Sequence, residues 1–451
     1  MNNKRKRRLS TYKLRANKLT MKELQKIKFC EMFLFSMIFA GMLSLPLAAS
    51  LFKSEETIMN FGKIAATIPL HVEGRYIKDA YGNTVYLRGV NKVEFCDDPD
   101  GTWMGSTMWS DENVKAELDV MKKWGINVVR CHFSIELWKY DIGPDSGHPA
   151  SPYCALSARE AIKRFVEFAA EKGIYVILDA YSVKCYWSDG KQDPLPFPPY
   201  QTSPGAAEII SSVNDFVDWW RSVARELKDY PNVMFELWNE PSPPDTRENW
   251  MIWLNAAQQC INAIREEGFN GIIFFEWSMG VYCNIYADGN FPLGVAREGY
   301  TLHNWLREAV SNLTDPANNL AFDVHLYRFG GGTGILQGED MQSYWNSTHA
   351  WNYSQIKMAM EYMGFKWAGE TLNVSLIVGE TGCDLGWKYS NPEEYQHEIT
   401  AFNNTLTILE EWNIHYTAFW WRETGAFRLH NGPPNFVPTE SGQILKEKLQ
   451  T

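Results

Sequence analysis

The chain has 451 residues, of which 45% are hydrophobic and 22% charged, a composition that is ordinary for a globular protein and excludes a disordered or fibrous one. Its net charge of −11 argues against nucleic acid and anionic lipid as partners. The 19 Trp residues are unusual and predict either a large aromatic core or flat stacking surfaces for a ligand with apolar ring faces.

The first 52 residues join a basic segment to an apolar one. Residues 1–28 contain 11 Lys and Arg against one acid, and residues 32–52 ("MFLFSMIFAGMLSLPLAASLF") carry no charge. This order is typical of a signal peptide with a small-residue exit near "LAAS", and the apolar run is also long enough for an uncleaved membrane anchor. In both cases we expect the rest of the chain outside the cell, either secreted or anchored, with residues 53–70 as a short linker. Cleavage after residue 52 would change the net charge from −11 to −20.

The cysteines after residue 52 are scattered and show no CxxC spacing, so a zinc site is not predicted. An extracellular chain permits one or more disulfides, and the odd count leaves at least one thiol unpaired. The seven residues are Cys96, Cys131, Cys154, Cys185, Cys260, Cys283 and Cys383.

From about residue 71 to the C-terminus, short apolar runs alternate with amphipathic stretches. Continuous runs rich in β-branched and aromatic residues are typical of parallel strands covered on both faces. The predicted strands are 84–91, 126–133, 174–181, 232–239, 271–278, 320–327, 374–380 and 414–421.

A helix is predicted after each strand. The first, at 110–125, begins with a Ser-Asp cap signal and ends at Gly125. The others are 156–173, 213–231, 246–268, 301–313, 353–365, 392–412 and 440–450. Eight strand–helix units predict an α/β fold, a single-domain (β/α)₈ TIM barrel over residues 71–451. An open doubly wound sheet is the alternative, disfavoured because no GxGxxG follows the first strand. Residues 73–85 are expected to form a β-hairpin that plugs the barrel floor.

In such a barrel the carboxyl ends of the strands carry function, and polar residues gather at those ends here. Glu240 follows the fourth strand and Glu380 ends the seventh. Cleavage of an acetal needs one acid to protonate the leaving oxygen and a second carboxylate at the anomeric carbon. We therefore predict Glu380 as nucleophile and Glu240 as acid/base, separated by the ~5–5.5 Å of a retaining enzyme.

The neighbouring polar residues predict supporting roles. Arg130 is the cation expected to hold Glu380 ionised, and Tyr327 is its expected hydrogen-bond donor. His325 ends the sixth strand beside Tyr327, and Asn239 can reach a sugar 2-hydroxyl. Trp420 is expected to form the stacking floor, with Trp421 as the alternative.

Glu236, expected on the inner face together with Trp238 and Glu240, is predicted to be a buried structural partner of Arg130. Trp138 and Trp187 are expected either to form outer sugar subsites or to pack in the core.

These residues also resemble a known family. "FELWNEP" (235–241) resembles the Asn-Glu-Pro signature of glycoside hydrolase family 5, a group of retaining (β/α)₈ glycosidases. Further resemblances follow in order at "LRGVN" (87–91), "GINVVR" (125–130), "HLY" (325–327), "VGE" (378–380) and "FWW" (419–421). The resemblance spans about residues 74–450 and implies that Glu240 is the acid/base and Glu380 the nucleophile. One departure is Tyr181, which stands where the family usually has a His and bears on sugar recognition.

The expected function is an endo-β-1,4-glucanase that acts on a polysaccharide or oligosaccharide, with a β-mannanase or another β-glucanase of the family as the alternative. A non-catalytic carbohydrate-binding barrel is the alternative of another class, and the presence of both Glu240 and Glu380 argues against it. No cofactor or metal is expected, because the nine His residues include no HExxH motif and no tight cluster. The sequence does not indicate endo or exo action or the oligomeric state.

Overall fold

The computed structural model describes residues 67–95, 110–147, 151, 154–181, 194–201, 209–241, 247–276, 302–327 and 352–451. All of them belong to one compact unit, Lys63–Thr451. The predicted signal or anchor segment at residues 32–52 lies outside these ranges. Among the helices within them, none has the length and apolar character needed to cross a bilayer.

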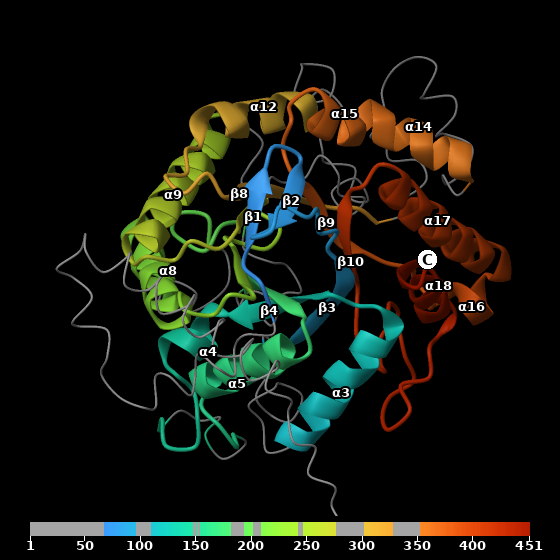
Figure 1. The fold of residues 1–451 in the computed structure, drawn as a ribbon, viewed down its shortest axis with the longest axis horizontal. Helices are drawn as coiled ribbons and strands as arrows, with labels where there is room; N and C mark the ends of the chain where they lie inside the picture. The colour runs from blue at the N-terminus through green and yellow to red at the C-terminus, as the bar shows by residue number, and fades with distance from the viewer. Residues whose placement is uncertain are drawn as a thin grey trace, which may run out of the picture. The chain divides into compact units, whose positions relative to one another are not determined.

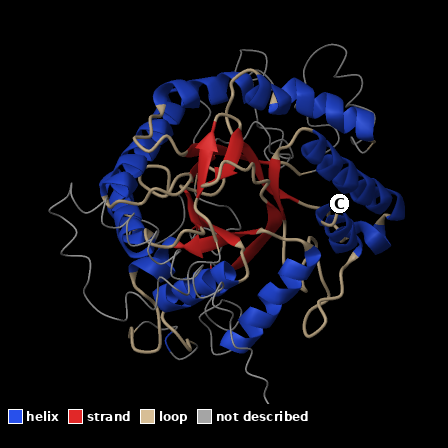
Figure 2. Cartoon of the chain, in the orientation of Figure 1, coloured by secondary structure: helices blue, strands red, loops and turns tan. Residues whose placement is uncertain are grey.

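Eight parallel strands close into a barrel in the order β10-β3-β4-β5-β6-β7-β8-β9. Figure 2 shows them as a ring inside the helices. The prediction of a (β/α)₈ barrel is therefore confirmed, and the open sheet is excluded. The strands are β3 Arg88–Phe95, β4 Val128–Ser134, β5 Tyr175–Tyr181, β6 Val233–Glu236, β7 Ile273–Glu276, β8 Leu320–His325, β9 Leu376–Thr381 and β10 His415–Ala418.

The helices surround the barrel (Figure 1). Those that follow the strands in the expected places are α3 Asp111–Trp124, α5 Ala158–Glu171, α8 Val213–Leu227, α9 Arg247–Glu266, α12 Leu302–Asn312, α14 Tyr353–Met363, α17 Pro392–Glu411 and α18 Glu440–Leu449. Three short helices were not predicted: α4 Ile135–Lys139, α15 Phe365–Glu370 and α16 Trp387–Ser390.

Helix α3 begins and ends at the residues that its cap signals predicted. The Ser110 hydroxyl accepts a hydrogen bond from the Asn113 backbone N–H, and Gly125 ends the helix with φ 98°. A Cβ at Gly125 would lie 2.6 Å from the Leu449 carbonyl oxygen, so both the left-handed backbone and the close approach require glycine here.

A hairpin covers the N-terminal end of the barrel, as predicted. Its strands, β1 Leu70–Glu73 and β2 Tyr76–Asp79, pair antiparallel. Leu70 and Ile77 pack with inward-facing barrel residues such as Ile177 and Phe274. The first barrel strand starts four residues later than predicted because the chain before it still pairs with the hairpin, where the Val85 N–H donates to the Ile77 carbonyl.

Successive side chains along each barrel strand point alternately into the barrel and toward the helices. This alternation determines which residues reach the site. On β4, Val129, Cys131 and Phe133 pack outward in the core between barrel and helices. Val128 points inward into the apolar floor, and Arg130 follows it on the same face. The barrel interior is therefore apolar near the hairpin and charged nearer the C-terminal ends of the strands.

Four cysteines, Cys131, Cys154, Cys260 and Cys383, are buried thiols. The other three lie outside the described ranges, so the expectation of a disulfide remains a prediction.

Candidate active site

The structure brings the two predicted catalytic carboxylates together at the C-terminal end of the barrel. The Nδ1 atom of His325 lies 3.0 Å from Oε1 of Glu240 and 3.6 Å from Oε2 of Glu380. A carboxylate oxygen of each Glu and a ring nitrogen of His325 all lie within 4.8 Å of one another. The structure therefore places Glu240 and Glu380 at one site, and the separation of a retaining enzyme remains a prediction.

Glu380 reaches the site through an irregularity in β9. The register between β8 and β9 shifts so that Val324 pairs with Val378 but His325 pairs with Glu380, leaving Gly379 as an extra residue. The Gly379 N–H donates to Oδ1 of Asp323 at 2.6 Å, and a Cβ at Gly379 would lie 1.9 Å from the other oxygen of that carboxyl. The bulge therefore requires glycine at this position and turns Glu380 into the barrel.

Glu380 is surrounded by donors that favour its ionised form. It receives hydrogen bonds from Arg130 Nη1 at 3.0 Å and from the Tyr327 hydroxyl at 2.6 Å, and His132 Nε2 lies 2.8 Å away. Burial, the largest single influence, opposes ionisation, but the charges of His325, His132 and Arg130 and the hydrogen bond from His132 hold the pKa of Glu380 well below its usual range. The contacts expected from Arg130 and Tyr327 are both present.

Arg130 is the centre of the buried network below the carboxylates. Its Nε and Nη2 atoms each donate to one oxygen of Glu236 at 2.8 Å, as the sequence predicted for a structural pair. It also donates to Oδ1 of Asn91 and to Oδ1 of Asn239, both at 3.0 Å. The guanidinium therefore binds Asn239, which follows β6, as well as Glu380 at the end of β9.

Trp238 does not share the inner face with Glu236, contrary to the prediction. Strand β6 ends at Glu236, so the alternation of side chains stops there. Trp238 is fully buried on the helix side, with its ring 6.2 Å from that of Phe216 in α8. Glu240 returns to the cavity because its backbone is left-handed, with φ 49°.

Three further buried acids line the barrel, and the sequence analysis missed them. Asp179 on β5, Glu276 on β7 and Asp323 on β8 are all 0% exposed. Burial, reinforced by the negative charge of Glu236, raises the pKa of each well above its usual range. Each is a single acid inside an apolar strand run, a pattern visible in the sequence that would have found all three.

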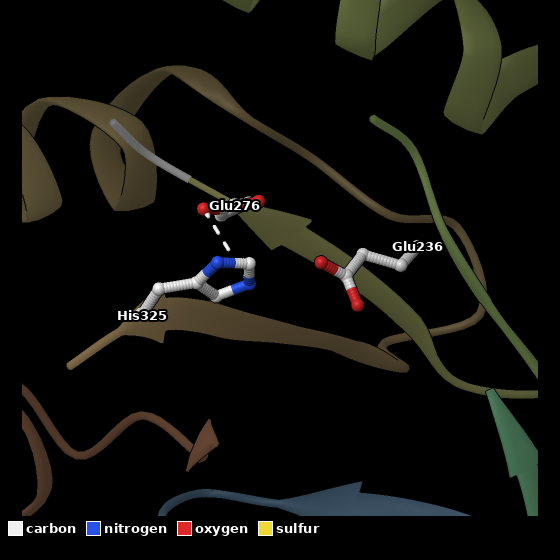
Figure 3. A group of neighbouring side chains, drawn as sticks. All are labelled: Glu236, Glu276 and His325. Carbon is white, nitrogen blue, oxygen red and sulfur yellow. Dashed lines mark ion pairs between the residues drawn. The ribbon is translucent and has the colours of Figure 1, made fainter. Parts of the chain in front are cut away.

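Within the described part of the chain, two groups of side chains have the spacing of metal ligands. Figure 3 shows the first, with Glu276 and His325 facing each other and Glu236 beside them. Both oxygens of Glu236 already accept hydrogen bonds from Arg130, so a guanidinium supplies the positive charge that a metal would bring. The second group consists of Glu240, His325 and Glu380. Arg130 also donates to Glu380, so both groups belong to one ion network built around this cation.

Aromatic side chains line one side of the site. Tyr181 stacks on His132 with ring centroids 5.4 Å apart, and it packs in a cluster with Phe419 and Trp420. Trp420 is partly exposed, whereas Trp421 is fully buried and donates its indole N–H to Glu117 at 2.8 Å. Only Trp420 of this pair has surface to offer a ligand, as the preferred assignment requires.

Of the two alternatives for Trp138, the structure supports packing in the core over an outer sugar subsite. Trp138 lies in α4, is 0% exposed and donates its indole N–H to the Ser222 hydroxyl, so it packs in the core. Trp187 lies outside the described ranges.

Comparisons with known proteins bear on the family of the chain. The model of the family described as "Cellulase (glycosyl hydrolase family 5)" matches residues 79–425. Endo-β-1,4-glucanase B of Aspergillus niger is 31% identical over 130 residues, 29% of this chain and 33% of that protein, so the match spans about a third of the relative's length. Mannan endo-1,4-β-mannosidase of Cellvibrio japonicus is 20% identical over 350 residues, 72% of this chain and 64% of that protein.

Solved structures share the fold. The endocellulase of Pyrococcus horikoshii, solved in complex with cellotetraose, superposes with a TM-score of 0.57 at 19% identity, over 85% of this chain and 99% of that one. At this identity the likeness establishes the barrel alone.

Proposed function

Because the chain belongs to the cellulase family, glycosyl hydrolase family 5, we propose that it hydrolyses β-1,4-linked glucan by double displacement. Glu380 is the nucleophile and Glu240 the acid/base. The observation that carries this proposal is a Glu380 carboxyl that accepts hydrogen bonds from Arg130 and Tyr327 and has an oxygen within 4.8 Å of a Glu240 oxygen. Two carboxyl groups this close leave no room for a water between acid and base, which favours retention over inversion.

In the first step a Glu380 oxygen bonds to the anomeric carbon as the bond from that carbon to the leaving oxygen breaks. Glu240 gives its proton to the leaving oxygen. In the second step Glu240 takes a proton from water, the water oxygen bonds to the anomeric carbon, and the ester bond to Glu380 breaks. Glu380 returns as a carboxylate, held again by Arg130 and Tyr327.

The neighbouring residues have roles in sugar binding. The Asn239 oxygen accepts a hydrogen bond from Arg130, so the amide nitrogen is the group that this side chain offers to a 2-hydroxyl. His325 orients the Glu240 carboxyl from 3.0 Å. Trp420 supplies a stacking face, and Tyr181 takes the place of the family's usual His at the same wall of the site.

The ion network also favours an enzyme over a non-catalytic sugar-binding barrel. A binder needs aromatic faces and neutral hydrogen bonds, and burying many acids around one arginine costs stability that binding alone does not require. β-Mannanase remains the second candidate, because the mannosidase of Cellvibrio japonicus matches the larger share of this chain.

A substrate panel tests the proposal. The purified protein, Glu240→Ala and Glu380→Ala are incubated with carboxymethyl cellulose, glucomannan, mannan, xyloglucan and laminarin, and new reducing ends are measured. We expect the wild type to be most active on the cellulose derivative and both variants to lose at least about 10³-fold. Highest activity on mannan would favour the mannanase, and inactivity on every glycan would reject the glycosidase.

We also propose that residues 32–52 direct the chain out of the cell, as a signal peptide or an anchor. N-terminal sequencing of the extracellular protein tests this. A mature N-terminus near residue 52 indicates cleavage, and retention of the whole activity in the cytoplasm would contradict the proposal.

A further inference from the structure

Strand β7 ends in an acid that neither step of the proposed reaction uses. Glu276 is fully buried, and the Trp253 indole N–H donates to its backbone carbonyl at 3.2 Å, which ties the strand end to α9. Its side chain points toward Glu240, in the segment that follows β6. The Oε2 atom of Glu276 accepts a hydrogen bond from the Glu240 backbone N–H at 2.6 Å.

This hydrogen bond satisfies the Glu240 N–H, which lies beyond the end of β6 and outside its strand pairing. The Leu237 N–H donates to the Phe274 carbonyl of β7, whereas the Asn239 N–H donates at 2.9 Å to the Ala180 carbonyl of β5, on the other side of the strand. One residue later the chain turns into the left-handed region at Glu240, which residues other than glycine rarely adopt. The Glu276 carboxyl receives the N–H at that turn and so stabilises a backbone conformation that is unfavourable by itself.

The charges around Glu276 favour its protonated form. Glu236 on β6, Asp323 and His325 on β8, Glu240 itself and, from β4, Arg130 all face it. Burial first, and then the negative charges of Glu236 and Glu240, hold the pKa of Glu276 well above its usual range. The Oε1 atom of Glu276 lies 3.8 Å from Nε2 of His325 (Figure 3).

We propose that Glu276 is a positioning residue for the acid/base. Its carboxyl accepts the Glu240 N–H and so fixes the backbone turn there, and that turn directs the Glu240 side chain toward His325 and the oxygen of the departing sugar. This inference rests on the proposed function of Glu240. It predicts that loss of the acceptor at Glu276 weakens proton donation while leaving the nucleophile intact.

Two variants of similar size separate this role from general stability. Glu276→Gln keeps a neutral acceptor for the Glu240 N–H, and Glu276→Met keeps the volume without one. Each is assayed on a 2,4-dinitrophenyl cellobioside, whose departure needs no proton, and on a phenyl cellobioside, whose departure does. For Glu276→Met we expect kcat/KM to fall about 10- to 100-fold on the phenyl substrate and under about 3-fold on the dinitrophenyl one. Glu276→Gln should remain within about 3-fold of wild type on both.

Controls keep this inference distinct from the proposed function. Glu240→Ala is the reference for lost proton donation. Asp315→Asn weakens a buried ion pair between Asp315, in the segment before β8, and Arg265 of α9, and it should leave the ratio of kcat/KM between the two substrates unchanged. A wild type inactive on both substrates would reject the proposed function itself. If Glu240→Ala loses far more kcat/KM on the phenyl substrate than on the dinitrophenyl one while Glu276→Met loses kcat/KM equally on both, only the role of Glu276 is overturned.

The pH profile provides a readout if Glu276→Met does not fold. Replacing a neutral acid by an amide leaves the charge near Glu240 unchanged, so the alkaline limb of kcat/KM for Glu276→Gln should coincide with that of wild type. If Glu276 is ionised in the wild type, its replacement removes a negative charge and moves that limb to lower pH by about one unit or more. Such a shift, or a Gln variant as impaired as the Met variant, overturns the proposal.

Discussion

Arg130 and Glu236 form a two-point ion pair inside the barrel, with Nε to Oε2 and Nη2 to Oε1 both at 2.8 Å. Neither side chain is exposed to solvent. The same guanidinium donates to the nucleophile candidate Glu380 at 3.0 Å. One cation therefore compensates the buried Glu236 inside the barrel and also donates a hydrogen bond to Glu380 at its C-terminal end.

Removal of this cation should be costly. Arg130→Met leaves Glu236 and its neighbours buried without a counter-charge, and we expect a loss of about 3–5 kcal/mol in the free energy of unfolding. Chemical denaturation at neutral pH measures it. As a matched control, Arg88→Met breaks a partly exposed pair with Glu410 at 3.3 Å, where a loss of about 1 kcal/mol or less is expected. Equal losses in the two variants would contradict the central role of Arg130.

The Tyr327 hydroxyl should tune the nucleophile. Tyr327→Phe removes a donor at 2.6 Å from Glu380 Oε2, and losing a hydrogen bond to the ionised form raises the pKa of that carboxyl. The acid limb of kcat/KM should therefore move to higher pH by about one unit. Tyr416→Phe, which loses a phenol hydrogen bond to Glu410 outside the site, is the control and should leave the limb in place. An unmoved limb in Tyr327→Phe would argue against Glu380 as the titrating group.

The barrel and the two main carboxylates could be predicted from sequence because they depend on local signals. Apolar runs of strand length, caps such as Ser110 and Gly125, and polar residues at strand ends are visible in the chain itself. The predicted starts of β4 through β10 differ from the observed ones by no more than two residues. Most of the polar residues that were predicted to gather at the strand ends also lie close together in the structure.

The rest depends on contacts between distant segments. Strict alternation from Ile377 would have turned Glu380 outward, and only the extra residue Gly379, which packs against Asp323, brings it into the site. In the same way, β6 ends at Glu236, so Trp238 lies on the helix side and not on the inner face. The left-handed turn then brings Glu240 back to the site. Neither irregularity leaves a pattern that can be read from one strand alone.

The two adjacent tryptophans should respond differently to truncation. Trp420→Ala removes a partly exposed ring beside the site, so KM should rise about 10-fold or more with little change in stability. Trp421→Ala removes a fully buried ring that contacts Trp124 with centroids 4.9 Å apart, and it should cost about 3–5 kcal/mol. Steady-state kinetics and denaturation of both variants provide the measurement. Loss of stability in Trp420→Ala without a change in KM would contradict its role in binding.

His415 should make the fold sensitive to mild acid. Burial lowers the pKa of His415 from 6.5 to about 4, while its Nδ1 accepts a hydrogen bond from the Leu87 N–H at 3.0 Å. Between these two values the unfolded chain binds a proton that the folded chain does not, so stability falls as pH drops through that range. The contribution is on the order of 3 kcal/mol.

His415→Asn keeps an acceptor near Nδ1 but cannot titrate. The difference in unfolding free energy between wild type and this variant should therefore shrink or reverse as the pH falls from 6.5 to about 4. Urea denaturation at several pH values measures that difference. A difference that stays constant with pH would mean that His415 is already protonated in the folded protein.

The identity of the nucleophile is the central claim, and azide rescue tests it most directly. Glu380→Ala is assayed on an activated aryl β-glycoside with and without sodium azide, and the configuration of the product is determined by NMR. The account predicts very low activity without azide and, with azide, restored cleavage that yields the inverted α-glycosyl azide, whereas Glu240→Ala should yield the retained β-glycosyl azide. Near-normal activity of Glu380→Ala without azide, or a β-glycosyl azide from this variant, would contradict the account.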